Sequence, residues 1–318
     1  MQIFLDDRPS ASLVLGGGGF VGAALRRSLS ADNREVTVLS RSPPSILHAN
    51  ETWITGDFAD EALLDRALRP GMDVYHLISG AVPAKGNWDV EQDILSSVIP
   101  TLKLLKAAVG KGVRRIIYVS SGGTVYGVPA SVPIHEDAPT DPISAYGVAK
   151  LTVEKYLALF ERHHGLSYRI LRVANPYGPG QLPNRQQGVV ANLLYQALSG
   201  RPFEIWGDGS AARDFIHVDD VARSLRAAAA YEGDERIFNI GSGVAIPISK
   251  VVDDIAQAMT ITSPSIIHHP SRQYDVPVNC LDIGKAKSEL GWTPSSKWPD
   301  GIDSIVLWLN HQMNSDQV

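Results

Sequence analysis

A tyrosine and a lysine four residues apart suggest acid–base chemistry on one face of a helix. Tyr146 and Lys150 enclose the sequence Gly-Val-Ala, and residues four apart are neighbours on a helix surface. A phenol is a poor base at neutral pH, but a nearby positive charge stabilises the phenolate and lowers the pKa of the phenol. Lys150 can supply that charge, so Tyr146 could take the proton of a substrate hydroxyl while hydride leaves the same carbon.

A run of glycines near the N-terminus suggests a phosphate-binding turn. Residues 13–22 read Leu-Val-Leu-Gly-Gly-Gly-Gly-Phe-Val-Gly. Gly17, Gly19 and Gly22 fit GxGxxG, whereas Gly16, Gly19 and Gly22 fit GxxGxxG. Either spacing suits a tight turn from a strand into a helix whose N–H groups bind a pyrophosphate. A flexible turn is the alternative, but an apolar run precedes the glycines and a helical pattern follows them, which favours a dinucleotide site.

Recognition of the adenosine half of such a cofactor is expected after the second and third strands. Ser40 and Arg41 end the second strand without a carboxylate, and Arg41 could pair with a 2′-phosphate, lie on the adenine or remain a solvated loop residue. Asp57 follows the third strand, where it could accept a hydrogen bond from adenine or cap a helix. We expect NAD as the cofactor, and the sequence leaves NADP open.

Strands and helices alternate in the part of the chain that carries these residues. Short apolar runs separated by segments of helical period predict a parallel sheet with helices on both faces. We expect strands at 13–15, 35–39, 53–55, 73–78, 115–120 and 168–173, and helices at 19–29, 93–109 and 145–163. The predicted fold class is α/β, with a doubly wound, Rossmann-type sheet.

Beyond residue 173 the elements are shorter, and loops rich in Pro and Gly interrupt them. We expect helices at 219–230, 248–259 and 302–312 and a strand at 236–240. The predicted organisation is a dinucleotide-binding domain at 12–174, to which 214–240 returns, and a smaller, discontinuous substrate domain at 175–213 and 241–314.

The composition favours a soluble, cytoplasmic protein. The 318 residues include 29 Lys and Arg and 34 Asp and Glu, a net charge of −5, so no cationic excess favours binding to nucleic acid. We expect no membrane span and no secretory signal, since no apolar stretch is long enough and the first residues lack a basic region. Cys280 is the only cysteine, which fits a reducing compartment. The adjacent histidine pairs lack the spacing of a metal-binding helix, so no metal site is expected.

Further motifs accompany the glycine loop and the Tyr146–Lys150 pair. They are Gly56-Asp57, the segment Ser120-Ser121-Gly122-Gly123-Thr124-Val125-Tyr126-Gly127, and blocks at 172–180, 206–215, 239–243 and 290–292. Together these motifs resemble the extended short-chain dehydrogenase/reductases, and within that family the nucleotide-sugar epimerases of the UDP-glucose 4-epimerase type. The motifs follow one another in order between residues 12 and 310, which makes the joint match specific.

The resemblance implies a role for each matching residue. Tyr146 would be the acid/base, and Lys150 would hold the nicotinamide ribose and lower the pKa of Tyr146. Cofactor contacts are implied for Gly16, Gly19, Phe20, Val21, Gly22, Ser40, Arg41, Asp57, Phe58, Leu77, Tyr146, Lys150 and Tyr177. Substrate contacts are implied for Asn175, Arg213, Arg272, Asp275 and Asn279.

These substrate contacts differ in kind. The two arginines would bind the diphosphate, for which guanidinium groups are well suited, or they could be ordinary surface arginines. Asp275 would bind the uridine ribose or cap a helix. Asn175 would contact the substrate phosphate or the neighbouring backbone. Asn279 would lie near the substituent at C2 of the sugar, where an N-acetyl group could fit.

The sequence departs from the family pattern at Gly122, where relatives carry Ser or Thr. That hydroxyl normally shares the reactive oxygen of the substrate with the tyrosine, so Ser121, Thr124 or a water must replace it, and we favour Thr124. The helix expected at 93–109 has Ser97 where the family carries Asn, beside an unusual Pro100.

Among the reactions of the family, we favour NAD-dependent epimerisation at C4 of a UDP-sugar, in which hydride is removed, the ketone rotates and hydride returns to the opposite face. Dehydratases of the family carry acidic residues before the Val-Tyr-Gly segment, where this chain has Gly123 and Thr124. The alternatives are an NADP-dependent nucleotide-sugar 4-keto reductase or dehydrogenase and a non-catalytic nucleotide-binding regulator. The resemblance also implies a homodimer formed through the helices at 93–109 and 145–163.

Overall fold

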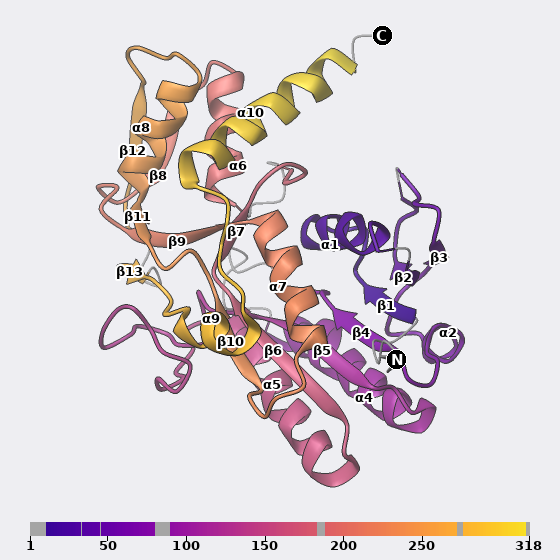
Figure 1. Ribbon diagram of the computed structural model, residues 1–318. Coiled ribbons are helices and arrows are strands. Elements are labelled where there is room, and N and C mark those ends of the chain that lie inside the picture. Colours follow the sequence, from indigo (N-terminus) through magenta and orange to yellow (C-terminus); the bar gives the residue numbers. More distant parts are fainter. Residues whose placement is uncertain are drawn as a thin grey trace, which may run out of the picture.

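Seven parallel strands form the central sheet of the protein (Figure 1). The computed structural model describes residues 11–32, 34–44, 46–79, 90–182, 188–271 and 276–315. Across the sheet the strands follow the order β10 (Ile237–Ile240), β6 (Ser167–Val173), β5 (Arg115–Ser121), β4 (Asp73–His76), β1 (Ala11–Leu15), β2 (Glu35–Ser40) and β3 (Glu51–Thr55). The predicted α/β fold with a doubly wound sheet is confirmed. Strand β10 comes from the C-terminal half of the chain and pairs with β6 at one edge.

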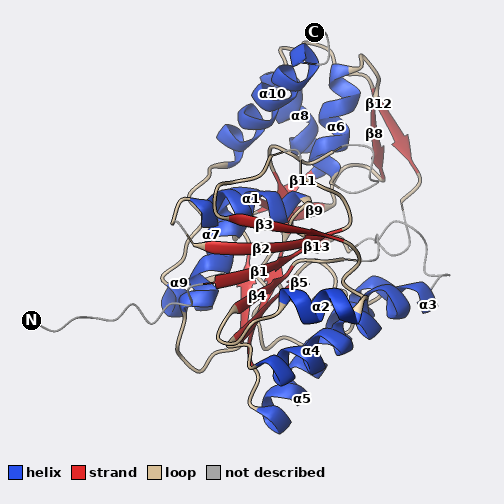
Figure 2. Ribbon diagram, turned by 90° about the vertical axis from the view of Figure 1, so that its right-hand side faces the viewer, coloured by secondary structure: helices blue, strands red, loops and turns tan. Residues whose placement is uncertain are grey.

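Helices cover both faces of this sheet (Figures 1 and 2). The elements over one face are α1 (Phe20–Ser30), α7 (Val218–Ala230) and α9 (Gly284–Leu290), and those over the other are α2 (Glu61–Ala67), α4 (Ile99–Lys111) and α5 (Ala145–His164). Alternate side chains of a strand point to opposite faces, so Val14 joins the core under α1 and α7 while Leu13 and Leu15 join the other core. The apolar β1 run is thereby buried on both sides.

The helix expected at 93–109 is not one continuous α-helix. The short helix α3 (Val90–Asp93) leads into a π-helical turn at Ile94–Val98, and α4 begins directly after it. The amide of Ile99 donates to the carbonyl of Ile94, five residues back. Pro100, in the first turn of α4, has no N–H to donate to the carbonyl four residues back, and the wider π turn ends just before it.

A second, smaller group of elements packs beside the carboxyl ends of the sheet strands. Strand β9 (Ala212–His217) is central to a small sheet with β7 (Asn175–Tyr177), β11 (Ala245–Pro247) and β13 (Val278–Asn279), while β8 (Phe203–Trp206) pairs with β12 (Ile266–His269). Helices α6 (Val189–Leu198), α8 (Ile248–Ala258) and α10 (Trp298–Ser315) enclose a third hydrophobic core. This core is separate from the two cores of the large sheet.

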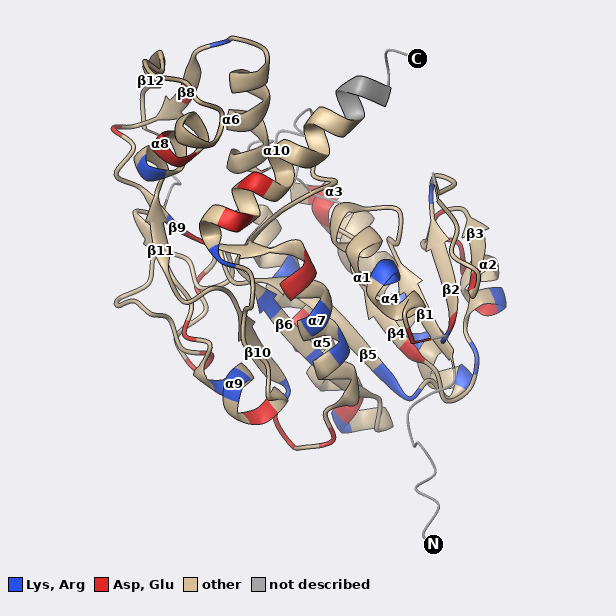
Figure 3. Cartoon of the chain, turned by 45° about the horizontal axis from the view of Figure 1, so that its top comes forward, with Lys and Arg blue, Asp and Glu red and all other residues tan. Residues whose placement is uncertain are grey.

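The surface carries charges of both signs. Lys and Arg are interspersed with Asp and Glu over helices and loops (Figure 3). Within the described ranges, no helix combines the length and the apolar character that crossing a bilayer requires.

A buried ion pair joins α5 to the sheet. Glu154 of α5 and Arg172 of β6 each expose 3% of the side chain, and Arg172 Nη2 donates to Glu154 Oε2 over 2.7 Å. Ser120 Oγ of β5 donates to Glu154 Oε1 over 2.5 Å. Both carboxylate oxygens therefore accept hydrogen bonds, which offsets the cost of burying the charge.

Removing one partner of this ion pair is expected to destabilise the protein strongly. Arg172→Met leaves the Glu154 carboxylate in the interior without its counter-ion, which costs about 3–5 kcal/mol in the free energy of unfolding. Urea unfolding followed by circular dichroism measures this loss. The double variant Glu154→Leu/Arg172→Met should recover much of it, because no unpaired charge remains. A double variant no more stable than Arg172→Met would contradict this assignment.

Candidate active site

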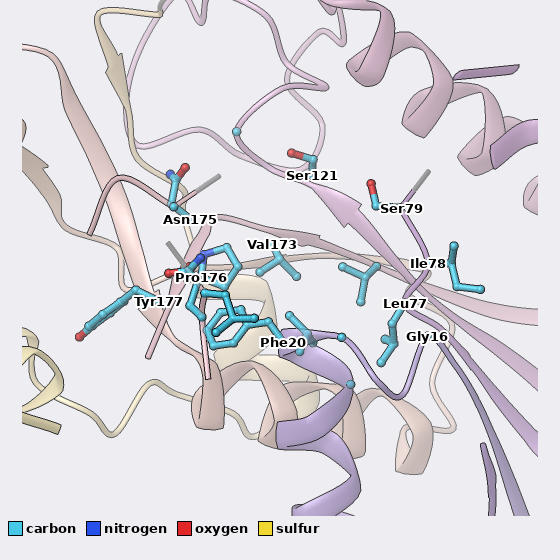
Figure 4. Close-up of a pocket in the computed structure, with 18 of the residues that line it drawn as sticks. Gly16, Phe20, Leu77, Ile78, Ser79, Ser121, Val173, Asn175, Pro176 and Tyr177 are labelled. Atoms are coloured by element: carbon cyan, nitrogen blue, oxygen red, sulfur yellow. The ribbon is translucent and has the colours of Figure 1, made fainter. Parts of the chain in front are cut away.

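A cleft of about 1900 Å³ lies between the carboxyl ends of the sheet strands and the second group of elements. Gly16, Ser121 and Tyr146 border it on the side of the sheet, and Arg201 and Arg213 border it on the other side. The strand order reverses between β1 and β4, the place where open α/β sheets bind ligands. Figure 4 shows part of the cleft, with residues from the ends of several strands around α1.

The glycine loop turns from β1 into α1 at this cleft. Gly16 has a φ of +83°, and its carbonyl accepts a hydrogen bond from the N–H of Gly19 over 3.0 Å. A Cβ on Gly22 would lie 2.3 Å from the Gly16 carbonyl oxygen, so α1 can approach the turn this closely only with glycine at that position. Among the described residues, no side chain caps α1, which begins at Phe20. The first N–H groups of the helix have no intrahelical acceptor and suit an anion.

This arrangement fits a dinucleotide. A pyrophosphate needs a close backbone approach and unpaired N–H groups, and the Gly16–Gly22 turn supplies both. Every residue expected to contact the cofactor borders the cleft, namely Gly16, Gly19, Phe20, Val21, Gly22, Ser40, Arg41, Asp57, Phe58, Leu77, Tyr146, Lys150 and Tyr177. The residues present would therefore hold the pyrophosphate at the glycine turn and the remaining parts along the ends of the neighbouring strands.

The structure decides between the two roles considered for Asp57, which were contact with adenine and capping of a helix. The cap of α2 is Asp60, whose side chain accepts hydrogen bonds from the N–H groups of Ala62 and Leu63. Asp57 Oδ1 accepts a bond from the N–H of Ala59 over 2.9 Å and borders the cleft. The capping role considered for Asp57 is therefore wrong, because another aspartate fills it.

Tyr177 borders the cleft, but its ring lies elsewhere. The side chain is 2% exposed and points away from Gly16 and Phe20 (Figure 4). Its ring packs against Phe215 and Trp298 in the third core, with centroids 6.4 Å and 4.9 Å away. The phenol of Tyr177 is thus part of the packing, and contact with a ligand would come from the backbone of β7.

Tyr146 and Lys150 lie at the start of α5, where Ser144 Oγ caps the helix by accepting the N–H of Gly147 over 3.1 Å. Lys150 Nζ donates to the carbonyl of Val119 over 2.9 Å and lies 5.8 Å from the centroid of the Tyr146 ring. Burial lowers the pKa of Lys150 to about 8, while the nearby Glu154 carboxylate raises it. The hydrogen bond to Val119 therefore holds the ammonium group over the ring of Tyr146.

The phenol of Tyr146 is held by two serines. Burial raises the pKa of Tyr146, and hydrogen bonds with Ser79 and Ser121 lower it. Thr124, the hydroxyl favoured from the sequence, borders the cleft, but its Oγ1 is buried without a hydrogen-bond partner in the described part of the chain. The structure thus places Ser121, rather than Thr124, against the tyrosine. Ser79 was missed, since the sequence offers only a small polar residue shortly after a strand.

Of the described residues expected to bind the substrate, two border the cleft and one does not. Arg213 borders the cleft, as does Asn175, whose Nδ2 donates to the backbone carbonyl of Asp214 over 3.0 Å. Asn279 is 1% exposed, donates to the carbonyl of Gly122 over 3.1 Å and does not border the cleft. The interpretation of Asn279 as a residue lining the sugar is therefore corrected: it supports the backbone behind the site.

The loop that carries the remaining two expected substrate residues is not described. Arg272 and Asp275 lie outside the described residues. Arg201 and Trp206 also border the cleft, and the Trp206 ring stacks on that of His269 with centroids 5.1 Å apart. No motif in the sequence pointed to Arg201, which follows α6 as a single arginine. Within the described part of the chain, no three His, Cys, Asp or Glu residues gather where they could hold a metal ion.

Comparisons with known proteins agree with this geometry. A family model described as the NAD dependent epimerase/dehydratase family matches residues 12–241. UDP-glucose 4-epimerase of Mycolicibacterium smegmatis is 33% identical over 311 residues, which cover 95% of this chain and 99% of the relative. The dTDP-4-dehydro-6-deoxyglucose reductase of Escherichia coli is 30% identical over 318 residues, covering 95% and 98%. The crystal structure of UDP-glucose 4-epimerase with UDP-glucose from Thermotoga maritima is 33% identical and superposes with a TM-score of 0.90, covering 95% and 99%.

Replacing Gly22 by alanine is expected to weaken NAD binding by at least about tenfold, because the added methyl group forces α1 away from the turn that holds the pyrophosphate. Isothermal titration calorimetry with NAD measures the loss. Gly110→Ala is the matched control, since a Cβ there meets open space on α4. This control should keep the NAD affinity and gain about 0.5–1 kcal/mol in stability. Unchanged NAD affinity in Gly22→Ala would refute the assignment.

Proposed function

Since the chain belongs to the NAD-dependent epimerase/dehydratase family, we propose that it catalyses NAD-dependent epimerisation at C4 of a UDP-sugar. The expected membership of the extended short-chain dehydrogenase/reductases and the expected cofactor NAD are confirmed by the family match. The observation that carries the proposed activity is the pairing of Tyr146 and Lys150 inside a cleft that the glycine loop also borders. An acid/base and a dinucleotide site thereby share one cavity.

The proposed chemistry divides between cofactor and protein. NAD, when bound, supplies a hydride acceptor that can also return the hydride. Tyr146 takes the proton of the C4 hydroxyl as that carbon is oxidised, and it gives a proton back to the oxygen when the ketone is reduced. Lys150 keeps a positive charge close to the phenol, which favours the phenolate form that accepts the proton.

The size and charge of the cleft support a second ligand beside the dinucleotide. Pockets for single ligands usually measure about 300–1,000 Å³, whereas this cleft measures about 1900 Å³. Arg201 and Arg213 border it away from the glycine loop, and guanidinium groups suit a diphosphate. We assign the UDP-sugar to this side, formed by the substrate domain at 175–213 and 241–314. The relatives named UDP-glucose 4-epimerase support this class of substrate.

A nucleotide-sugar 4-keto reductase is the second candidate. The Escherichia coli relative carries the name of such a reductase, and Arg41 borders the cleft at the end of β2, where it could pair with the 2′-phosphate of NADP. The two functions differ in their use of cofactor. An epimerase regenerates NAD in each cycle, whereas a reductase consumes reduced cofactor in proportion to product.

We further propose that the protein forms a homodimer through α3, the π-helical turn, α4 and α5. Apolar side chains are exposed along these neighbouring helices, namely Val90, Ile94, Leu95, Ile99, Val148 and Leu159. Contiguous exposed apolar residues of this kind are typical of protein interfaces. The long helix α5 would then contribute Tyr146 to the cleft and Leu159 to the interface.

Tyr146→Phe is expected to lower turnover by about 10²–10⁴-fold, the usual contribution of a general acid/base. Proton NMR of the protein with UDP-hexoses, UDP-N-acetylhexosamines and UDP-hexuronic acids, without added reductant, identifies both the reaction and the sugar. Tyr156→Phe on the same helix is the matched control, because this partly buried tyrosine packs against the second core and does not border the cleft. Full turnover by Tyr146→Phe would exclude the mechanism, and stoichiometric loss of NADPH in a parallel assay with added NADPH would favour the reductase.

Negative charges introduced at the proposed interface are expected to prevent the two subunits from associating. Ile94→Glu/Leu159→Glu places two carboxylates on the exposed apolar surface, where burial in an interface would leave them desolvated and unpaired. Light scattering coupled to size-exclusion chromatography should show a dimer for the wild type and a monomer for this variant. Leu307→Glu on α10 replaces another exposed leucine and should remain dimeric. A monomeric wild type would exclude the proposed homodimer.

A further inference from the structure

The position where the family carries its second active-site hydroxyl is tightly packed in this protein, where it is Gly122. A Cβ on Gly122 would lie 2.5 Å from Leu281 Cδ1 and 3.0 Å from the carbonyl oxygen of Arg172. The carbonyl of Gly122 also accepts the bond from Asn279. Gly122 does not border the cleft, although Ser121 and Gly123 on either side of it do. A side chain at position 122 would therefore point into packed residues behind the site.

Two serines, Ser79 and Ser121, border the cleft, whereas Gly122 does not. Neighbouring parallel strands β4 and β5 pair His76 with Tyr118, and Ser79 and Ser121 each follow three residues later. The register thus brings Ser79, which lies just past the end of β4, to the level of Ser121, the last residue of β5, and Figure 4 shows both in the cleft. Side-chain hydrogen bonding with each serine lowers the pKa of Tyr146.

We propose that Ser79 and Ser121 are positioning residues that together replace the missing hydroxyl at position 122, by holding the phenol oxygen of Tyr146 in both of its protonation states. This inference rests on the proposed function for its catalytic meaning. A serine hydroxyl can rotate and act as donor or acceptor. When Tyr146 is protonated, one serine accepts its O–H while the other donates to its oxygen. When Tyr146 is a phenolate, both serines donate.

This arrangement favours the form of Tyr146 that accepts the substrate proton. Hydrogen bonds to an ionised acceptor are stronger than those to a neutral one, so two donors stabilise the phenolate more than the phenol. The proton of the C4 hydroxyl passes to the phenolate as hydride leaves C4, and it returns by the same route. The serines exchange no proton with the sugar, and they keep the phenol oxygen in one place during both transfers.

Charged and titratable groups also lie on the elements around Tyr146. Asp93 at the end of α3 raises the pKa of Tyr146, and the ammonium of Lys150 lies 5.8 Å from the centroid of the Tyr146 ring. Tyr118 of β5 is buried beneath Lys150, and burial raises the pKa of its phenol. Burial lowers the pKa of His76 on β4 to about 3, so this ring is uncharged at neutral pH. These groups are unchanged in the serine variants below.

The serines can be tested without depending on turnover. The ultraviolet absorbance of tyrosinate is titrated against pH in the wild type and in Tyr146→Phe, and the difference isolates Tyr146 among the ten tyrosines. The same pair of titrations is run in Ser79→Ala, in Ser121→Ala and in the double variant. Each alanine should move the Tyr146 titration to higher pH, and the double variant should move it furthest. Ser79→Thr retains the hydroxyl and should restore the wild-type titration.

Kinetics with UDP-glucose provides the second readout. The acidic limb of the pH–rate profile should move to higher pH, and turnover below that limb should fall about tenfold for each serine removed. Ser288→Ala, an exposed serine of α9, is the control for loss of a hydroxyl elsewhere. A folded double variant with a wild-type Tyr146 titration would overturn this inference, whether or not the proposed function stands. Full activity of Tyr146→Phe would instead contradict the proposed function, and the Tyr146 titration would still test the role of the two serines.

Discussion

Glu154 fixes the position of α5 on the sheet, and the active-site geometry depends on that position. Its carboxylate accepts hydrogen bonds from Ser120 of β5 and Arg172 of β6, so three elements meet at one buried charge. Tyr146 and Lys150 lie eight and four residues earlier, on the same face of the helix. Anchoring the middle of α5 therefore sets where both side chains enter the cleft. The same carboxylate opposes the effect of burial on the pKa of Lys150.

The parts of the fold that the sequence predicted are those with a strong local signal. The runs around Leu13 and Ile116 are apolar because both faces of these strands are covered, and such runs can be recognised without the structure. The glycine turn was also predictable, because a positive φ at Gly16 and the close approach at Gly22 leave little choice of residue. The Tyr146–Lys150 pair was found from its helical spacing together with its place on a helix that follows a predicted strand.

The errors concern features that depend on distant parts of the chain. Asn279 belongs to a short C-terminal strand, and only the folded chain shows that its amide faces the Gly122 carbonyl instead of the cleft. Ser79 reaches the cleft through the register between β4 and β5, and no local sequence pattern predicts that register. The π-helical turn before Pro100 changes the helix without changing the apolar repeat, so periodicity could not reveal it. The first two features are set by tertiary contact, whereas the π-helical turn lies beside Pro100, which has no N–H to donate.

The contact between Gly122 and the C-terminal part of the chain has a consequence for the order in which the protein can fold during synthesis. Leu281 fills the space behind Gly122, and Ile134 exchanges backbone hydrogen bonds with Cys280 and Asp282. The segment after β5 that carries Gly122 is therefore completed by residues translated more than 130 positions later. A nascent chain that has already made the glycine turn and α5 still lacks the residues around Leu281 that pack behind Gly122. The glycine turn is complete near the start of the chain, whereas the candidate active site is complete only when almost the whole chain has been made.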